Sequence, residues 1–388
     1  MSVTATPGFA AAGVNAGIRP SGKPDVALVR SLIPSVGCAM WTTNRVQAAP
    51  VTVSRRHLAA AEPQAVVVNA GVANAATGQA GEEDAERTAA HAAARLGLAP
   101  EQVLVLSTGV IGPRLPMAKL LAGVDEAAVA LSPDGGPSAA EAILTTDAGP
   151  KTAVAARDGF TVGGMAKGAG MIHPRLATML AVVTTDYALA EGEADELLRP
   201  AVERTFNRIS VDGDCSTNDA VVLLASGAAA IERTPATDAE LALAIRTVCA
   251  DLAQQVVADG EGATLLAEIA VSGAASAPEA RAIAQRIATS PLVKTALFGR
   301  DANWGRVLAA AGSAPFNGGY AQLDPALVSL SYNGTPVLVN GAPQNTEPPV
   351  DGGVCTIELD LGLGEGSAGY LTSDLSYDYV RINAEYRS

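Results

Sequence analysis

A glycine-rich loop that runs directly into a short apolar segment, between Gly163 and Asp186, constrains this chain more than any other feature. The loop part holds four glycines and one lysine, Lys167, and the apolar run covers residues 176–183. Glycine and proline favour loops, whereas a short, continuous apolar run is typical of a buried strand. The sequence therefore predicts a junction between loop and strand, and Thr178 occupies that junction.

Length and composition predict a large apolar core and restrict the possible partners. The chain has 388 residues, of which 48% are hydrophobic, and this length favours two domains. No basic segment followed by an apolar one opens the chain, and no apolar run reaches membrane-spanning length, so we expect a cytoplasmic protein. The four cysteines lack metal-ligand or disulfide spacing, which fits reduced thiols. A formal charge of −14 argues against nucleic-acid binding, which needs clustered Lys and Arg.

The periodicity of apolar residues predicts both helices and strands, and so an α+β protein. The capping box Thr237-x-x-Glu240 predicts the start of a long helix that continues through Val257. The remaining expected elements are strands at 65–68, 103–106, 265–271 and 355–361, hairpins at 151–165 and 328–339, and helices at 82–96, 193–206 and 278–287.

Two patterns that could indicate a bound cofactor are incomplete. The glycines between residues 9 and 29 do not form the Gly-x-Gly-x-x-Gly fingerprint of a dinucleotide site. The three aspartates of the turn 210–219 lack the spacing and the final glutamate of a calcium loop. We therefore expect neither a cofactor nor a metal ion.

The segment Ser107-Thr108-Gly109, at the end of a predicted strand, is a candidate oxyanion hole. A threonine hydroxyl followed by a glycine amide can present two donors to one oxygen, because glycine lets the backbone approach closely. Ser-Thr-Gly is also a common turn, and the residues alone leave both interpretations open.

Several of these segments resemble the ornithine acetyltransferase family, also called glutamate N-acetyltransferase. The strongest is Lys-Gly-x-Gly-Met-Ile-x-Pro-x-x-Ala-Thr-Met-Leu at 167–180, and the segments 9–29, 210–219 and 290–306 are also similar to the family. The resemblance covers roughly residues 9–388, and several separate motifs are far more specific than one. It implies acetyl transfer from N2-acetyl-L-ornithine to L-glutamate in arginine biosynthesis, without cofactor or metal.

The resemblance also implies a fold and a processing event. The fold would be a helix-sheet-sheet-helix sandwich similar to self-processing N-terminal-nucleophile proteins, with a smaller C-terminal α/β domain from about residue 235. The family cuts its own peptide bond before the threonine that matches Thr178, here the bond from Ala177. The products would be an α chain, residues 1–177, and a β chain, residues 178–388, which are expected to assemble as α2β2.

The site residues follow from the resemblance, position by position. Thr178 would be the nucleophile, and Thr108 and Gly109 would form the oxyanion hole. The residues that match the family's substrate contacts are Thr145, Lys167, Thr178, Glu261, Asn383 and Ser388.

The chemistry of Thr178 agrees with this interpretation. A threonine hydroxyl needs a base, yet none of the three histidines lies in a nucleophile-elbow motif. Cleavage would give Thr178 a free α-amino group, whose unperturbed pKa of about 7.7–8.0 suits a base at neutral pH. The nucleophile would then carry its own base.

Three alternatives stay open at this point. An aminopeptidase or amidase with the same kind of nucleophile would discharge its acyl-enzyme to water. A non-catalytic binding protein would keep an intact chain. Within the acetyltransferase interpretation, acetyl-CoA could be a second donor, and the sequence does not decide this.

Overall fold

The computed structural model describes residues 2–173 and 179–385, which divide into two compact units. Of the described residues, the first unit comprises those up to Asn207 together with Asp214–Val256, and the second comprises Arg208–Gly213 and residues 257–385. The predicted positions Ala177, Thr178 and Ser388 lie outside the described residues.

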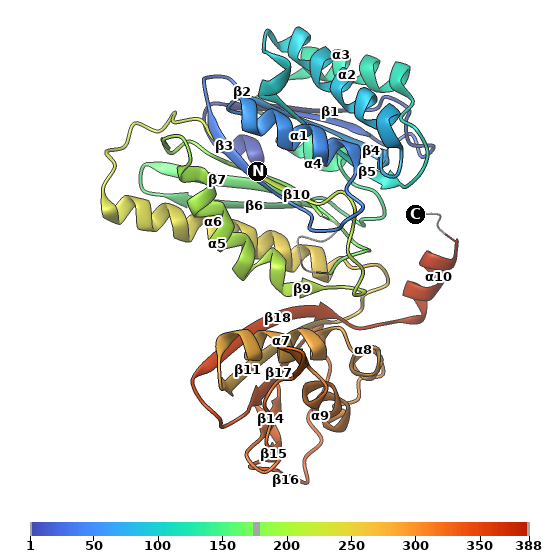
Figure 1. Cartoon of the computed structure of the whole chain (residues 1–388), viewed down its shortest axis with the longest axis vertical. Coiled ribbons are helices and arrows are strands. Elements are labelled where there is room, and N and C mark those ends of the chain that lie inside the picture. The colour runs from blue at the N-terminus through green and yellow to red at the C-terminus, as the bar shows by residue number, and fades with distance from the viewer. Residues whose placement is uncertain (1, 174–178, 386–388) are drawn as a thin grey trace. The chain divides into compact units, whose positions relative to one another are not determined.

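Two β-sheets form the centre of the first unit (Figure 1). The four-stranded sheet has the order β1 (Phe9–Val14), β2 (Val26–Ser31), β4 (Ala65–Val72) and β5 (Val103–Val110). The five-stranded sheet has the order β3 (Val36–Trp41), β10 (Ala220–Ala225), β8 (Leu180–Thr185), β7 (Phe160–Lys167) and β6 (Lys151–Arg157). β4 pairs with β5 and β8 pairs with β10 in parallel, whereas β6, β7 and β8 are antiparallel.

The two sheets share one apolar core. Val68 and Leu106 from the four-stranded sheet and Val182 and Val222 from the five-stranded sheet belong to the same buried cluster. Every residue of β8 and of β10 is buried, as expected for central strands covered on both faces. Each fully buried Val or Leu side chain contributes about 1.5–3 kcal/mol, so this core fixes the strand ends that carry the polar residues described below.

Helices cover the outer faces of both sheets. On the four-stranded sheet, Val53, Ala85 and Leu120 belong to one buried cluster with Val67 and Val105. These three residues come from α1 (Ala49–Ala60), α2 (Gly78–Leu96) and α3 (Met117–Ala130), while α4 (Gly136–Ala142) contributes to the core between the sheets.

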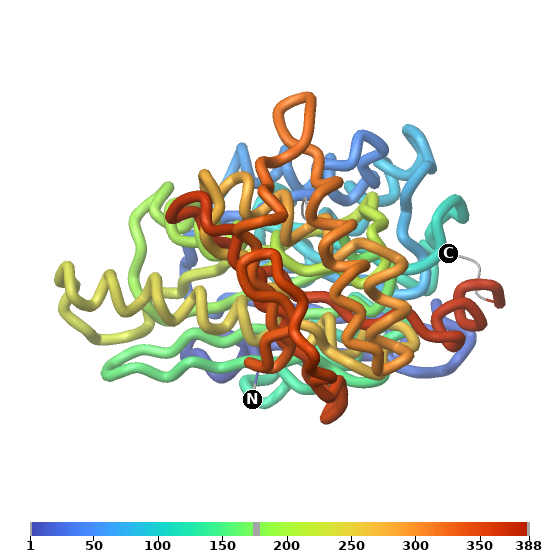
Figure 2. Tube along the Cα trace, turned by 90° about the horizontal axis from the view of Figure 1, so that it is seen from below, coloured from blue at the N-terminus to red at the C-terminus, as the bar shows by residue number. Residues whose placement is uncertain are grey.

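On the five-stranded sheet, Gly164 faces the side chains of Val248 and Leu252 from α6 (Pro235–Ala258). α6 runs along the β6–β7 hairpin in both views (Figures 1 and 2), and α5 (Glu193–Arg204) packs against β3. The layers are therefore helix, sheet, sheet, helix, which confirms the predicted α+β class and its sandwich.

The start of α6 differs from the prediction. The helix begins at Pro235, and the N–H of Thr237 donates to the hydroxyl of Thr234 at 3.2 Å. Thr234 is therefore the N-cap, three positions before the residue that the capping-box pattern selected. Proline is well tolerated in the first turn of a helix, where its missing N–H costs nothing, so the helix includes Pro235.

One helix among the described residues, α6, is long and apolar enough to cross a membrane by length and composition alone. Its apolar face packs inside the protein, however, because Leu241, Ile245 and Val248 are fully buried. This is the pattern of a core helix.

The second unit is a mixed seven-stranded sheet with helices on one face. Its strand order is β16 (Ala342–Pro343), β15 (Thr335–Val339), β14 (Ser329–Tyr332), β17 (Val354–Asp360), β11 (Leu266–Ala274), β18 (Gly366–Ser373) and β9 (Ile209–Ser210), and a small hairpin joins β12 (Pro315–Phe316) to β13 (Gly319–Tyr320). The helices on this face are α7 (Ala277–Ala288), α8 (Pro291–Phe298) and α9 (Trp304–Gly312), whereas α10 (Tyr377–Glu385) follows β18 and has no buried residue.

The hairpin predicted at 328–339 is confirmed as β14–β15. Asn333 and Gly334 have φ angles of +49° and +74°, as a tight turn with two left-handed residues requires. Along β17, buried and exposed residues alternate, so one face of this sheet packs on the helices and the other faces outward.

Candidate active site

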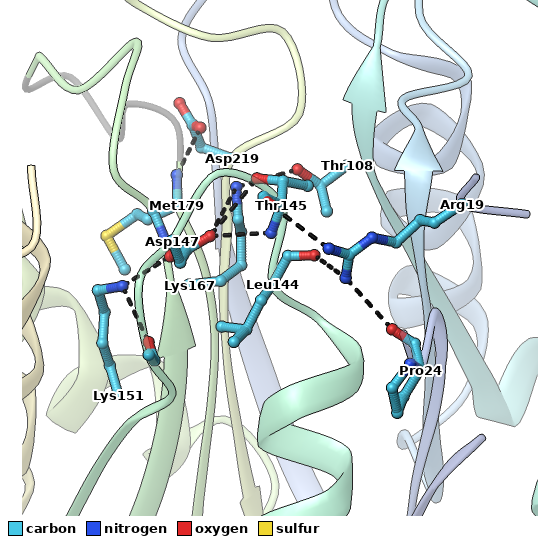
Figure 3. Close-up of polar contacts among 12 residues, drawn as sticks. Arg19, Pro24, Thr108, Leu144, Thr145, Asp147, Lys151, Lys167, Met179 and Asp219 are labelled. Atoms are coloured by element: carbon cyan, nitrogen blue, oxygen red, sulfur yellow. Dashed lines mark hydrogen bonds and ion pairs between the residues drawn. The ribbon is translucent and has the colours of Figure 1, made fainter. Parts of the chain in front are cut away.

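A buried polar cluster lies where several strands of the first unit end (Figure 3). Thr108 comes from β5, Lys151 from β6 and Lys167 from β7, whereas Thr145 and Asp147 lie in the loop between α4 and β6. Three of the residues selected from the sequence, Thr108, Thr145 and Lys167, are thus brought into one cluster.

Lys167 and Thr108 are in direct contact. The Lys167 Nζ donates to Thr108 Oγ1 at 3.2 Å, and the two residues are only 3% and 6% exposed. Because Thr108 Oγ1 accepts this bond from a cation, its own hydroxyl hydrogen remains to be donated elsewhere and is polarised by the charge. This geometry suits a hydroxyl that stabilises a developing negative charge.

Gly109 has a backbone conformation that other residues rarely adopt. Its φ is +126°, and a Cβ added there would lie 2.3 Å from the carbonyl carbon of Gly71, its register partner on β4. Glycine is therefore required at this position, both by its conformation and by the close approach of the two strands.

Asp147 is the carboxylate at the centre of this cluster. Its Oδ1 accepts hydrogen bonds of 2.6 Å from Lys151 Nζ and 2.6 Å from the Gly168 N–H. Its Oδ2 accepts from the Thr145 N–H at 2.9 Å and lies 4.0 Å from Lys167 Nζ. Asp147 therefore joins the loop before β6 to the residues at the end of β7.

The charges of the cluster determine the state of this carboxylate. Burial by itself raises the pKa of Asp147, but the charges of Lys167 and Lys151, with the hydrogen bonds, outweigh it and hold the pKa well below its usual range. Asp147 is consequently an anion between two buried ammonium groups. Both ammonium groups lie in a region of low dielectric, where a cation interacts strongly with an anionic group such as a carboxylate.

Arg19 supports the loop that carries Thr145. One guanidinium nitrogen, NH1, donates to the carbonyl of Leu144 at 2.9 Å and to that of Pro24 at 3.3 Å, and NH2 donates to the carbonyl of Thr145 at 3.4 Å. The loop is thus held by hydrogen bonds from Arg19 to its carbonyl groups and by those of its own Asp147 side chain (Figure 3).

Asp219 lies at the start of β10 and contacts the residue that begins the described part of the chain after the gap. Its Oδ1 accepts a hydrogen bond of 2.9 Å from the Met179 N–H (Figure 3). Met179 follows Thr178 directly in the sequence.

The second unit brings together two of the other predicted residues. Asn383 Nδ2, on α10, donates to Glu261 Oε2 at 2.8 Å and to the Tyr379 carbonyl at 3.0 Å. Glu261 is half-buried and Asn383 is exposed. Among residues 2–173 and 179–385, no group of three or more His, Cys, Asp or Glu is arranged to hold a metal ion.

The sequence interpretation did not select Arg19, Asp147, Lys151 or Asp219. Asp147 could have been selected from the sequence, because a carboxylate that lies just before a strand starting with Lys151 is expected to pair with a lysine. Lys167, on the partner strand of the same hairpin, is the second candidate. Arg19 gave no such signal, since its partners are backbone groups. Asp219 lies in the turn 210–219, which resembles the family and is interpreted as scaffolding of the site, but its contact with Met179 could not be predicted.

The fold and this cluster define an α+β protein with a buried site of charged residues at the strand ends of a two-sheet sandwich. The model of the ArgJ family matches residues 10–388, and the chain belongs to this family. The family expected from the sequence is thereby confirmed.

Individual proteins agree with this assignment. The chain is 47% identical to the arginine biosynthesis bifunctional protein ArgJ of Thermobifida fusca, over 100% of both chains. It is 49% identical to the protein of the same name from Mycolicibacterium paratuberculosis, over 100% of this chain and 96% of that protein. Among solved structures, it is similar to ornithine acetyltransferase from Mycobacterium tuberculosis complexed with ornithine, with 47% identity, a TM-score of 0.44, and coverage of 45% of this chain and 96% of that one.

Proposed function

We propose that this chain is an acetyltransferase that moves an acetyl group from N2-acetyl-L-ornithine to L-glutamate, in arginine biosynthesis. The observation that carries the proposal is the family match over residues 10–388, together with relatives named as arginine biosynthesis bifunctional proteins. The buried cluster of the first unit supports it, because both substrates carry an α-carboxylate and the buried Lys167 ammonium is a group that can bind one.

Self-cleavage comes first in this proposal. The Thr178 hydroxyl attacks the carbonyl carbon of Ala177, the bond from that carbon to the Thr178 nitrogen breaks, and the nitrogen takes up a proton. Water then hydrolyses the resulting ester, which leaves a carboxylate on Ala177 and both a free hydroxyl and a free α-amino group on Thr178. The products are an α chain, residues 1–177, and a β chain, residues 178–388.

Acetyl transfer uses the same hydroxyl. The α-amino group of Thr178 takes its proton while the oxygen attacks the acetyl carbonyl, and ornithine leaves with that proton on its amine. The amine of glutamate then attacks the acetyl-threonine ester and leaves as N-acetylglutamate, while Thr178 recovers its hydroxyl. In both halves, Thr108 and Gly109 would donate to the oxyanion, and such a donor contributes about 2.7–4 kcal/mol to transition-state stabilisation.

The remaining residues would bind substrate. Lys167 would pair with the α-carboxylate, and Thr145, held by Asp147, would contact the same end of the substrate. Glu261 offers a negative charge to the side-chain ammonium of ornithine, and Asn383, which donates to Glu261, fixes the orientation of its carboxylate. Ser388 completes the proposed set.

We also propose where the protein works, how its chains assemble and what it requires. The protein would work in the cytoplasm, as an α2β2 assembly, without cofactor or metal. Acetyl-CoA stays a candidate second donor.

The proposal is tested by assaying the purified protein with N-acetylornithine, with and without glutamate. We expect ornithine to accumulate only when glutamate is present, and the T178A variant to be inactive and uncleaved. Steady release of ornithine without glutamate would instead identify an amidase. Activity or cleavage in T178A would overturn the proposal, and acetyl-CoA with glutamate as the only substrates tests the second donor.

A further inference from the structure

Met179 is held at both of its backbone groups. Its N–H donates to Asp219 Oδ1 at 2.9 Å, and its carbonyl accepts from the Ala220 N–H at 3.1 Å. The second of these bonds continues the parallel pairing of β8 with β10, and a residue of any type at position 220 other than proline would make it. The first bond requires a side-chain acceptor, and Asp219 supplies it.

The environment of Asp219 is unusual for a residue that only caps a strand. Asp219 is 1% exposed, and among the described residues its second oxygen, Oδ2, is buried without a hydrogen-bond partner. Burial raises the pKa of this carboxyl well above its usual range, against the opposing effects of the Met179 N–H, the Ser216 and Thr42 hydroxyls and the Lys167 charge. Burying a carboxyl at a strand end is costly, so its retention asks for a reason beyond a single hydrogen bond.

The backbone position of Asp219 is also fixed. Its carbonyl accepts from the Thr42 N–H at 3.0 Å, next to β3, and its own strand, β10, lies between β3 and β8 in the sheet. Asp219 directly precedes a strand that has neighbours on both sides, so its carboxyl moves little and can hold the Met179 amide in one place.

We propose that Asp219 is a positioning residue for the self-cleavage reaction, acting through the amide of Met179. The inference rests on the proposed function. The bond to be cut lies one residue before that amide, and the attack needs the hydroxyl and the carbonyl carbon at near-contact distance and in line. Fixing the first amide after Thr178 restricts the backbone on the product side of the bond, so the reactive geometry is populated more often.

The test is the rate at which freshly made 388-residue chain converts into fragments, followed on denaturing gels in three Asp219 variants. D219A removes the acceptor, and we expect cleavage to slow by about tenfold, the effect of losing one buried hydrogen bond. D219N keeps an oxygen acceptor in place without the charge, and should cleave within a fewfold of the wild type. D219E keeps the charge but displaces the oxygen, and should cleave slowly.

Asp186 provides a matched control, because it follows β8 directly, at the end of that strand opposite to Met179. Its Oδ1 accepts from the Thr161 N–H at 2.7 Å, and the residue is 3% exposed. D186A therefore also removes a buried bond from a carboxylate to a backbone amide, and should lower the melting temperature while leaving the cleavage rate unchanged.

The outcomes separate the inference from the proposed function. Three results would each overturn the positioning role. The first is cleavage of D219A at the wild-type rate, and the second is equal slowing in D186A and D219A. The third is fast cleavage in D219E with slow cleavage in D219N. If D219A does not fold, the contrast between D219N and D219E decides alone. If T178A itself is cleaved, the proposed function fails, whereas an uncleaved T178A with a fast D219A removes only the role of Asp219.

Discussion

At the scale of single residues, Lys167 has the clearest consequence for substrate binding. It is buried, it donates to Thr108, and it lies near Asp147, so its charge reaches both the proposed oxyanion hole and the proposed carboxylate site. A buried ammonium cannot be replaced by water without loss, because the surrounding dielectric is low.

We therefore expect K167M to raise KM for both N-acetylornithine and glutamate, by about 10- to 100-fold, because each loses a charge-assisted hydrogen bond to its α-carboxylate. Lys23 is exposed, and K23M is the matched control with unchanged kinetics. Steady-state kinetics with each substrate varied in turn would check this, and an effect on only one substrate would contradict a shared carboxylate site.

Asp147 allows a prediction about stability and its dependence on pH. D147N leaves two buried lysines without their carboxylate, so the free energy of unfolding at pH 7 should fall by about 3 kcal/mol. The pKa of Asp147 is lowered in the folded protein, so its contribution is present above the unfolded-state pKa, about 3.9, and is lost as pH falls through the folded value.

Urea unfolding at several pH values measures this difference. The gap between wild type and D147N should shrink below about pH 4, where the unfolded chain takes up the proton. The exposed Asp134 gives the control D134N, which should stay within about 0.5 kcal/mol of wild type. Equal stability of D147N and wild type at pH 7 would show that the cluster is not held by this carboxylate.

The residues of the site differ in how far the sequence could predict them. Thr108, Gly109 and Lys167 stand beside recognisable glycine-containing motifs, and their selection rested on resemblance. Arg19 and Asp219 bind backbone groups that are distant in sequence, and such partners leave no periodic pattern. Their roles follow only from the pairing of strands in three dimensions.

At the scale of elements, α6 shows what local patterns can and cannot fix. The apolar face with Leu241, Ile245 and Val248 was predicted from its spacing and is buried. The first residue of the helix was misplaced, because Thr234 and Thr237 both precede apolar residues and both can cap. Capping signals that lie one turn apart compete, and tertiary packing decides between them.

We expect T234A to lower the free energy of unfolding by about 1 kcal/mol, because the Thr237 N–H loses its acceptor. T247A is the control, since the Thr247 hydroxyl only donates to the Leu243 carbonyl within the same helix and is exposed. Denaturant unfolding of both variants tests the assignment, and a larger loss in T247A than in T234A would refute it.

At the scale of the whole molecule, the strand order has a consequence for a cleaved chain. In the five-stranded sheet, β3, β6 and β7 precede residue 177, whereas β8 and β10 follow it. β10 lies between β3 and β8, and β8 lies next to β7, so the two proposed fragments would share one sheet and its buried core.

The fragments should therefore stay together after cleavage. We expect a single peak in size-exclusion chromatography under native conditions, and two bands of about half length on a denaturing gel. Separation of the two fragments without denaturant would contradict a sheet built jointly from both.

The α+β class and most of the helices and strands could be predicted from periodicity, because one apolar face is enough to define each element. The order of the strands could not, because β10 lies between β3 and β8, and it pairs with β3 through residues more than 170 positions apart, such as Cys38 with Leu223. Long-range pairing of this kind decides which strand ends meet, and so decides the composition of the site.

The central claim is that Thr178 becomes an N-terminal residue that carries acetyl groups. Intact-mass measurement of the purified protein, before and after incubation with N-acetylornithine alone, tests it most directly. The account predicts two masses, for residues 1–177 and 178–388, and a gain of one acetyl group on the second chain only. A single mass for the full chain of 388 residues, or acetylation of the first chain, would contradict it.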